Sequence, residues 1–223
     1  MFVTTYKSAA EVNSAMIRVY QNMMIAVLIS MVTSFIVGNT PMMMALFFGT
    51  PLKWLIMLAP IGFILFFSFK MEDLSKDTAT MLLWVFSVLM GLSFSAIFVI
   101  YTGASIVMSF MSAAILFGCM TFYGYFTKRS LESFGQFLIV GLIAICIASI
   151  VNIFVGSSVM TTVISALAII IFLGLTAYDT QRIREMVSYD NNGNAEVAGA
   201  LTLYLDFINI FLNLLHLFGS KNE

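Results

Sequence analysis

Long apolar runs alternate with short polar joints along the whole chain. Seven of these runs are close to the ~20 residues that an α-helix needs to cross the hydrocarbon core of a bilayer. The pattern therefore predicts an all-α integral membrane fold, with seven transmembrane helices in one domain over residues 1–223. The runs cover residues 17–37, 52–69, 79–100, 105–126, 134–155, 161–180 and 197–218.

Composition supports a membrane protein. Hydrophobic residues make up 61% of the 223 residues and charged residues only 9%, whereas a soluble domain carries roughly 25% charged residues. A net charge of −1 gives no reason to expect nucleic acid as a partner. Cys119 and Cys146 both fall inside apolar runs, so we expect buried small hydrophobes rather than a disulfide or a metal pair.

The basic residues predict the orientation of the chain. With a cytoplasmic N-terminus, eight of the ten Lys and Arg residues fall on the cytoplasmic side, and only Lys53 and Lys221 fall outside. Seven spans then place the C-terminus on the opposite side. The short loops and the lack of an organelle signal suggest a prokaryotic cytoplasmic membrane.

The last run carries its polar residues in one line. Their spacings of 4, 3, 4 and 3 residues put all of them on one face of a helix. Near the middle is Asp206, at a depth where a lone charge costs at least ~2.5–3.5 kcal/mol. Such a residue is expected to face a partner or a water-filled cavity. The polar positions are Thr202, Asp206, Asn209, Asn213 and His216.

A second carboxylate falls within an apolar run. Of the 11 acidic residues, only Asp179 and Asp206 lie inside runs, and we assign the other nine, Glu196 among them, to loops or tails. Asp179 is about one turn from the cytoplasmic end of the sixth run, and Asp206 about two and a half turns from that end of the seventh. Because consecutive helices are antiparallel, the two carboxylates are expected to approach each other.

Two close carboxylates in a medium of low dielectric constant tend to share a proton, bind a cation or perform acid/base chemistry. Oxygen ligands without His or thiolate favour a hard cation such as calcium. Thr202 and Asn209 could add neutral oxygens, and Asn213 continues the same stripe. Plainer interpretations remain open, namely a local salt bridge from Arg182 to Asp179, asparagines that join helices and an interfacial His216.

At these residues the chain resembles the Bax inhibitor family. The resembling segments are AYDTQRI (177–183), LYLDFIN (203–209) and FLNLL (211–215), with weaker matches at KRSL (128–131) and NIF (152–154). Tyrosine–aspartate motifs in two consecutive helices make the resemblance specific, and the seven-run layout extends it over essentially the whole chain.

The resemblance implies a last helix that is central and surrounded by the other six. It also implies a pH-sensitive calcium leak in which Asp179 and Asp206 form the pH sensor. A basic residue at the end of the second helix latches the first aspartate in this family, and Lys70 is the nearest match here; Arg182 is a second candidate latch. No cofactor is expected, and calcium enters only as the transported or bound ion.

Other functions fit parts of the pattern. An intramembrane aspartyl protease also pairs two aspartates, but it needs Gly-x-Gly before the second one, where this chain has bulky Leu203, Tyr204 and Leu205; we expect no enzyme. A cation/proton exchanger would use the same pair. A non-transporting regulator of stress, cell death or a membrane protease would bind a membrane-protein partner, with loop 189–194 as a possible docking site. Otherwise the expected partners are the lipid bilayer, calcium and protons.

The first outer joint carries three consecutive methionines, Met42, Met43 and Met44. Without nearby His or Cys ligands, we interpret them as flexible packing or interfacial residues rather than copper ligands.

Overall fold

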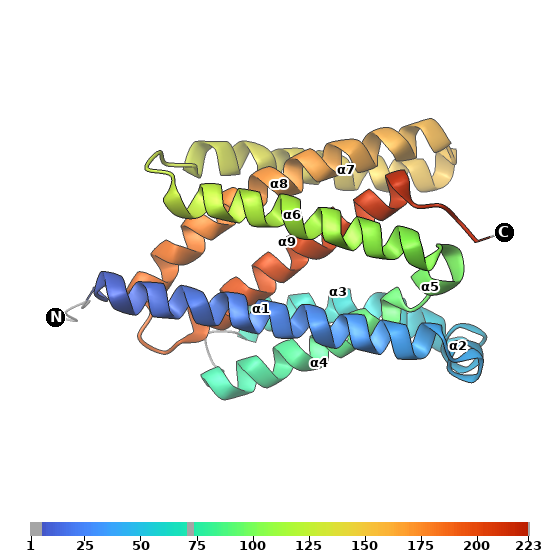
Figure 1. The fold of residues 1–223 in the computed structure, drawn as a ribbon, viewed down its shortest axis with the longest axis horizontal. Helices are drawn as coiled ribbons and strands as arrows, with labels where there is room; N and C mark the ends of the chain where they lie inside the picture. Colours follow the sequence, from blue (N-terminus) through green and yellow to red (C-terminus); the bar gives the residue numbers. More distant parts are fainter. Residues whose placement is uncertain (1–5, 71–73, 223) are drawn as a thin grey trace. The chain divides into compact units, whose positions relative to one another are not determined.

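The structure is a computed structural model that describes residues 6–70 and 74–222. These residues are predominantly α-helical, and Figure 1 shows the course of the chain. The α-helices are α1 (Ala9–Gly38), α2 (Pro41–Phe48), α3 (Leu52–Lys70), α4 (Lys76–Phe94), α5 (Ile97–Ile100), α6 (Gly103–Phe126), α7 (Glu132–Val155), α8 (Ser158–Tyr189) and α9 (Asn194–Phe218).

The predicted all-α membrane class is confirmed. Within the described residues, six helical stretches are long and apolar enough to cross a membrane, and each contains one of the predicted runs. The remaining run, 52–69, lies on α3. This helix meets the same test only together with α2, from which it is bent by 77°. The number of candidate spans is therefore six, or seven if α2 and α3 count as one broken span.

Helix α2 was not expected from the sequence. The three methionines that we assigned to an outer loop belong to it, after Pro41 at its first position. Proline is tolerated at that position because its missing N–H would have no helical partner. No residue of α2 is buried, and Met42 is 84% exposed, so the interfacial interpretation of these methionines remains.

The chain divides into two compact units, which we describe separately. Unit 1 comprises the residues before Gly103 with Met186–Tyr204 and the C-terminal residues from Lys221. Its helices α1 and α4 pack side by side (Figure 1), in contact where a Cβ on Gly91 would overlap the backbone of Ser30. The Ser30 hydroxyl lies 2.7 Å from the Tyr204 hydroxyl and donates to the Ser87 carbonyl at 2.8 Å, so polar contacts tie the core of this unit together.

Unit 2 comprises Gly103–Glu185 and Leu205–Ser220, that is α6, α7, most of α8 and most of α9. Phe110 and Phe117 of α6 make edge-to-face contacts with Phe207 of α9, with ring centroids 5.3 and 5.7 Å apart. The turn between α7 and α8 is closed by Gly156 at φ 68° and by Asn152, whose amide donates to Ser157 and Thr161. This capping gives the weak family match at residues 152–154 a structural role.

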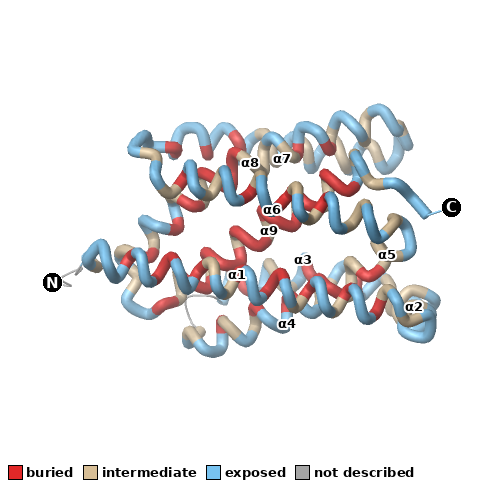
Figure 2. The backbone as a smooth tube through the Cα atoms, in the orientation of Figure 1, coloured by how far each residue is buried: buried red, intermediate tan, exposed pale blue. Residues whose placement is uncertain are grey.

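Burial distinguishes α9 from the other candidate spans. In its most apolar window 67% of the residues are buried, against 6–33% in the other five helical stretches, and Figure 2 shows buried positions along most of its length. That α9 is surrounded by six helices stays a prediction.

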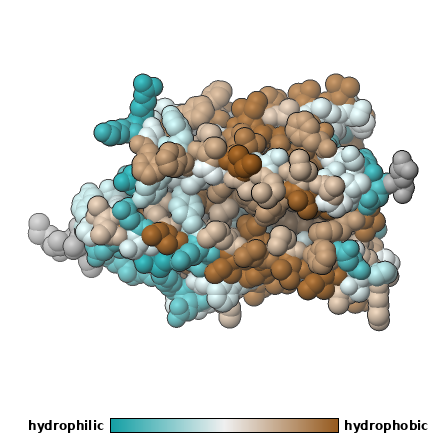
Figure 3. Space-filling model, in the orientation of Figure 1, coloured by the Kyte–Doolittle hydropathy of each residue, from teal (hydrophilic) through white to brown (hydrophobic). Residues whose placement is uncertain are grey.

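Large apolar side chains cover much of the exposed surface. They predominate over the middle of the face drawn in Figure 3, as expected where helices meet lipid rather than water. Both cysteines are free and exposed, so the expectation that they are buried was wrong. The reason is that a membrane helix is apolar on its lipid-facing side as well as on its packed side.

Candidate carboxylate site

The two carboxylates singled out by the sequence lie in the same unit. Asp179 is on α8 and Asp206 is on α9. They are close enough for their charges to repel each other, and the side chain of Arg182 attracts Asp179. The structure thus brings together a pair of like charges on two consecutive helices, with one basic group on the Asp179 side.

Asp206 is the more enclosed member of the pair. It is 4% exposed, and its Oδ2 atom has no hydrogen-bond partner among the residues that the structure describes. Thr121 on α6 holds a second such atom, since its Oγ1 is buried and also without a partner in the described part of the chain. Buried polar atoms are nearly always paired. Each of these two oxygens is therefore suited to bind a proton or a water molecule, and the carboxylate oxygen of Asp206 is also suited to bind a cation.

Close packing fixes the turn of α8 that carries Asp179. A Cβ on Gly124 of α6 would overlap the backbone of Ala177, and a Cβ on Gly135 of α7 would overlap the ring of Tyr178. Both neighbours therefore have to be glycines for α8 to approach this closely. Asp179 follows directly, so its position is set by the contact of Gly124 with the Ala177 backbone and by the contact of Gly135 with the Tyr178 ring.

Gln181 continues this anchoring. Its amide donates to the Arg129 carbonyl at 3.0 Å and accepts from the Leu131 amide at 2.8 Å. Arg184, one turn further, donates to the Tyr125 carbonyl and stacks over the Tyr125 ring at 4.9 Å. The structure therefore joins two segments of the family resemblance, residues 177–183 and 128–131, through Gln181. The sequence motif contained this residue without indicating its partner.

The neutral oxygens of the α9 stripe are engaged with their own helix. Thr202 donates to the Ala198 carbonyl, and the amides of Asn209 and Asn213 donate to the carbonyls of Leu205 and Asn209 at 2.8 Å each. Each bond uses a donor, so each side-chain oxygen keeps its acceptor capacity. These hydrogen bonds lie within α9, so they do not join it to another helix.

The remaining candidate residues lie at helix ends or on the surface. Lys70 is the last residue of α3 and is exposed, and its role as a latch for Asp179 stays a prediction. Arg182 is exposed on α8. His216 is exposed near the end of α9, where its Nδ1 lies 3.2 Å from the hydroxyl of the buried Ser165.

The described residues contain no group of three or more His, Cys, Asp or Glu side chains placed to hold a metal ion. A cation at this pair would therefore have two carboxylates, neutral oxygens and water as ligands. That set suits a hard ion in transit better than a resident metal.

Glu196, a buried carboxylate like Asp206, was missed by the sequence analysis. We assigned Glu196 to a loop, but it lies in the first turn of α9 in unit 1 and is only 2% exposed. Arg18 of α1 reaches it with two hydrogen bonds of 2.6 and 2.8 Å, and Lys76 of α4 with one of 2.7 Å. Because it directly precedes the apolar run 197–218, no pattern within that run identified it.

The electrostatics of Glu196 favour its charged form. Burial raises the pKa of this carboxyl, but the hydrogen bonds from Arg18 and Lys76 outweigh burial and leave the pKa below its ordinary value. An ionised Glu196 therefore ties the first turn of α9 to Arg18 of α1 and to the first residue of α4 within unit 1.

The joint between α8 and α9 is shorter than predicted. Tyr189 is the last residue of α8, and Asn194 is the first of α9. Asp190 accepts from the backbone amides of Asn192 and Ala195, and Asn194 donates to the Leu74 carbonyl at 2.9 Å. Residues 190–193 thus form a hydrogen-bonded turn, and docking of a partner to loop 189–194 stays a prediction.

Comparison with known proteins identifies the family. The family model described as "Inhibitor of apoptosis-promoting Bax1" matches residues 12–223. The chain is 37% identical over 219 residues to the "Inner membrane protein YbhL" of Escherichia coli, covering 95% of this chain and 94% of that protein. It is 40% identical over 214 residues to the uncharacterized protein RP147 of Rickettsia prowazekii, covering 93% and 90%. The chain belongs to the Bax inhibitor-1 family of membrane proteins.

Proposed function

We propose that this protein is a pH-sensitive leak for cations, favouring calcium, and that Asp179 and Asp206 form its gate. The observation that carries the proposal is the Oδ2 atom of Asp206, which has no hydrogen-bond partner among the described residues and belongs to an almost fully buried carboxylate whose charge is repelled by that of Asp179.

The physical argument concerns the charge of the pair. Two like charges that repel each other in a poorly hydrated place are relieved by a shared proton or by a divalent cation. A proton and a cation therefore compete for the same oxygens. At low pH the pair of carboxylates binds a proton, and at higher pH the deprotonated pair can bind calcium. Arg182 moderates the repulsion from the Asp179 side.

Further side-chain oxygens on α9 continue the row of polar positions beyond Asp206. Asn209 and Asn213 keep free acceptor capacity one and two turns beyond Asp206, because their amide groups are turned to their own backbone. We propose that they are weak contacts for an ion that passes rather than ligands of a bound one. Conduction requires sites that release the ion as readily as they bind it.

We further propose that the pair does not catalyse peptide hydrolysis. Leu203 and Tyr204, which precede Asp206, are fully buried. Close approach of a substrate backbone would need glycines at such positions. A regulatory role without transport would leave the unpaired oxygen of Asp206 without a use, so we rank it below the leak.

The test is calcium entry into liposomes that contain a calcium-sensitive dye. We expect the wild-type protein to admit calcium and Asp206→Asn to reduce or deregulate the flux. Asp77→Asn is the matched control, because it removes the same charge from an exposed first helical turn. Equal flux with equal pH dependence in wild type and Asp206→Asn would overturn the proposal. Strict one-for-one coupling of calcium entry to proton exit would replace the leak by an exchanger.

A further inference from the structure

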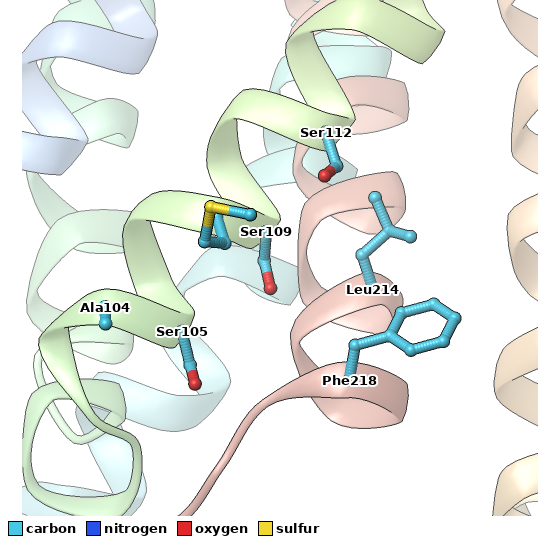
Figure 4. A pocket seen from close by; sticks show the side chains of 7 residues that line it. Ala104, Ser105, Ser109, Ser112, Leu214 and Phe218 are labelled. Atoms are coloured by element: carbon cyan, nitrogen blue, oxygen red, sulfur yellow. The ribbon is translucent and has the colours of Figure 1, made fainter.

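Unit 2 contains a cavity of about 340 Å³ between the beginning of α6 and the end of α9. Its size falls within the range of roughly 300–1,000 Å³ that is usual for small-molecule sites. In Figure 4, serine hydroxyls line it from α6, and Leu214 and Phe218 line it from α9. No part of the carboxylate site lines this cavity.

The three serines are spaced for one helix face. Ser105, Ser109 and Ser112 are four and three residues apart, so α6 presents them in one line. Ser109 is only 5% exposed, and no hydrogen bond joins its hydroxyl to any residue that the structure describes. A helical serine commonly donates to the carbonyl four residues earlier, as Ser149 does to Ile145 at 2.8 Å. The Ser109 hydroxyl instead remains available to whatever occupies the cavity.

The other walls are apolar and reach the surface. Met108 is 68% exposed and Phe218 is 75% exposed, and no charged side chain lines the cavity. Exposed apolar side chains on helices of membrane-spanning length face lipid. The cavity therefore opens to the bilayer, and its chemistry fits a neutral hydrogen-bond acceptor joined to an apolar body rather than an ion.

The depth of the serines in the membrane further restricts the class of ligand that fits the cavity. Ser105 and Ser109 are two and six residues beyond the first residue of α6, which is roughly 3 and 9 Å along the helix. The headgroup region of a bilayer takes up about 5–7 Å on each side of the hydrocarbon core. In a helix that begins at the outer edge of the headgroup region, hydroxyls at these positions span the depth at which the glycerol esters of a phospholipid give way to its acyl chains.

We propose that this cavity binds the glycerol-ester region of a phospholipid. Ser109 donates to an ester carbonyl, and the acyl chain lies against Met108, Leu214 and Phe218. On α9, Leu214 and Phe218 lie on a different face from the polar stripe of Thr202, Asp206, Asn209, Asn213 and His216. The lipid site is therefore separate from the proposed gate, and neither inference depends on the other.

Paired lipids test the proposal. Delipidated protein in detergent is titrated with a phosphatidylethanolamine carrying two ester-linked chains, or with its diether analogue of the same headgroup and chains. Bound lipid is counted by native mass spectrometry. The diether lacks only the carbonyl acceptors, so the wild-type protein is expected to prefer the diester by roughly three- to tenfold, the worth of one net hydrogen bond.

Three variants locate the effect. Ser109→Ala is expected to bring the preference to within about twofold, and Ser109→Leu, which fills the cavity, is expected to weaken binding of both lipids. Ser149→Ala is the matched control and is expected to keep the wild-type preference. Equal binding of the two lipids by the wild type, or an undiminished preference in Ser109→Ala, would overturn the proposal. These two results suffice even if Ser109→Leu fails to fold.

Discussion

Replacing Glu196 by Gln perturbs the buried ion pairs at the start of α9 while preserving the size of the side chain. The wild-type carboxylate accepts two hydrogen bonds from Arg18 and one from Lys76. A neutral amide has one acceptor oxygen instead of two and carries no charge. The variant therefore loses both ion pairs and at least one of the three hydrogen bonds.

The magnitude follows from the exposure of the partners. Removing one member of a fully buried ion pair costs about 3–5 kcal/mol. Here the side chains of Arg18 and Lys76 are 45% and 37% exposed, so water takes over part of their solvation. We therefore expect a loss of about 2–3 kcal/mol in the free energy of unfolding, in line with charged hydrogen bonds worth ~1.5–3 kcal/mol each. At roughly 2–4 °C per kcal/mol, the melting temperature falls by about 4–12 °C.

Thermal unfolding in detergent, followed by circular dichroism, measures this loss. The matched control is Glu132→Gln, because Glu132 is also in a first helical turn but is exposed. It is expected to cost no more than about 1 kcal/mol through the helix dipole. Equal melting temperatures for Glu196→Gln and Glu132→Gln would refute the argument that the buried ion pairs stabilise unit 1.

The difference in stability between the wild type and Glu196→Gln is expected to depend on pH. Since the folded-state pKa of Glu196 lies below its ordinary value of 4.5, its stabilising contribution is present above that value and is lost as pH falls through the folded-state pKa. The difference in melting temperature between wild type and Glu196→Gln should be constant near neutral pH and shrink below about pH 4.5. A difference that grows on acidification would contradict the assigned direction.

Two further changes test how Asp179 is positioned. Gly124→Ala should destabilise the protein by about 1–3 kcal/mol because its Cβ overlaps Ala177, whereas the Cβ of Gly118→Ala on the same helix meets open space and should stabilise it by up to ~1 kcal/mol. Thermal unfolding compares the two variants, and a higher melting temperature for Gly124→Ala than for Gly118→Ala would contradict this packing argument. Gln181→Ala should release the turn between α6 and α7, so trypsin should cleave faster after Arg129; an unchanged cleavage rate would show that these hydrogen bonds do not hold the turn.

Most of the fold could be predicted from the sequence because a membrane-spanning helix is recognised by its length and its apolar composition. The run 17–37 lies within α1, which begins eight residues earlier, and the run 197–218 lies within α9, which begins three residues earlier. The break at Gly49 and Pro51 was missed, since the residues before it are as apolar as those after it. Apolarity also hides which side of a helix is packed, which is why both cysteines were wrongly expected to be buried.

The candidate site was predictable only in part. Asp179 and Asp206 stand out because carboxylates are rare inside apolar runs, and the structure places them within electrostatic reach. Glu196 did not stand out, because its partners Arg18 and Lys76 are 178 and 120 residues away in the chain. The roles of Gly124 and Gln181 likewise depend on contacts with other helices that no local spacing records.

The most direct test of the proposed gate is the pH profile of calcium flux in a double-mutant cycle. Wild type, Asp179→Asn, Asp206→Asn and the double variant are reconstituted into dye-loaded liposomes and compared between about pH 5 and pH 8. If the pair acts as one unit, each single variant abolishes the pH dependence and the double variant adds nothing further. Additive effects of the two substitutions, or a pH dependence that survives in the double variant, would contradict the central claim.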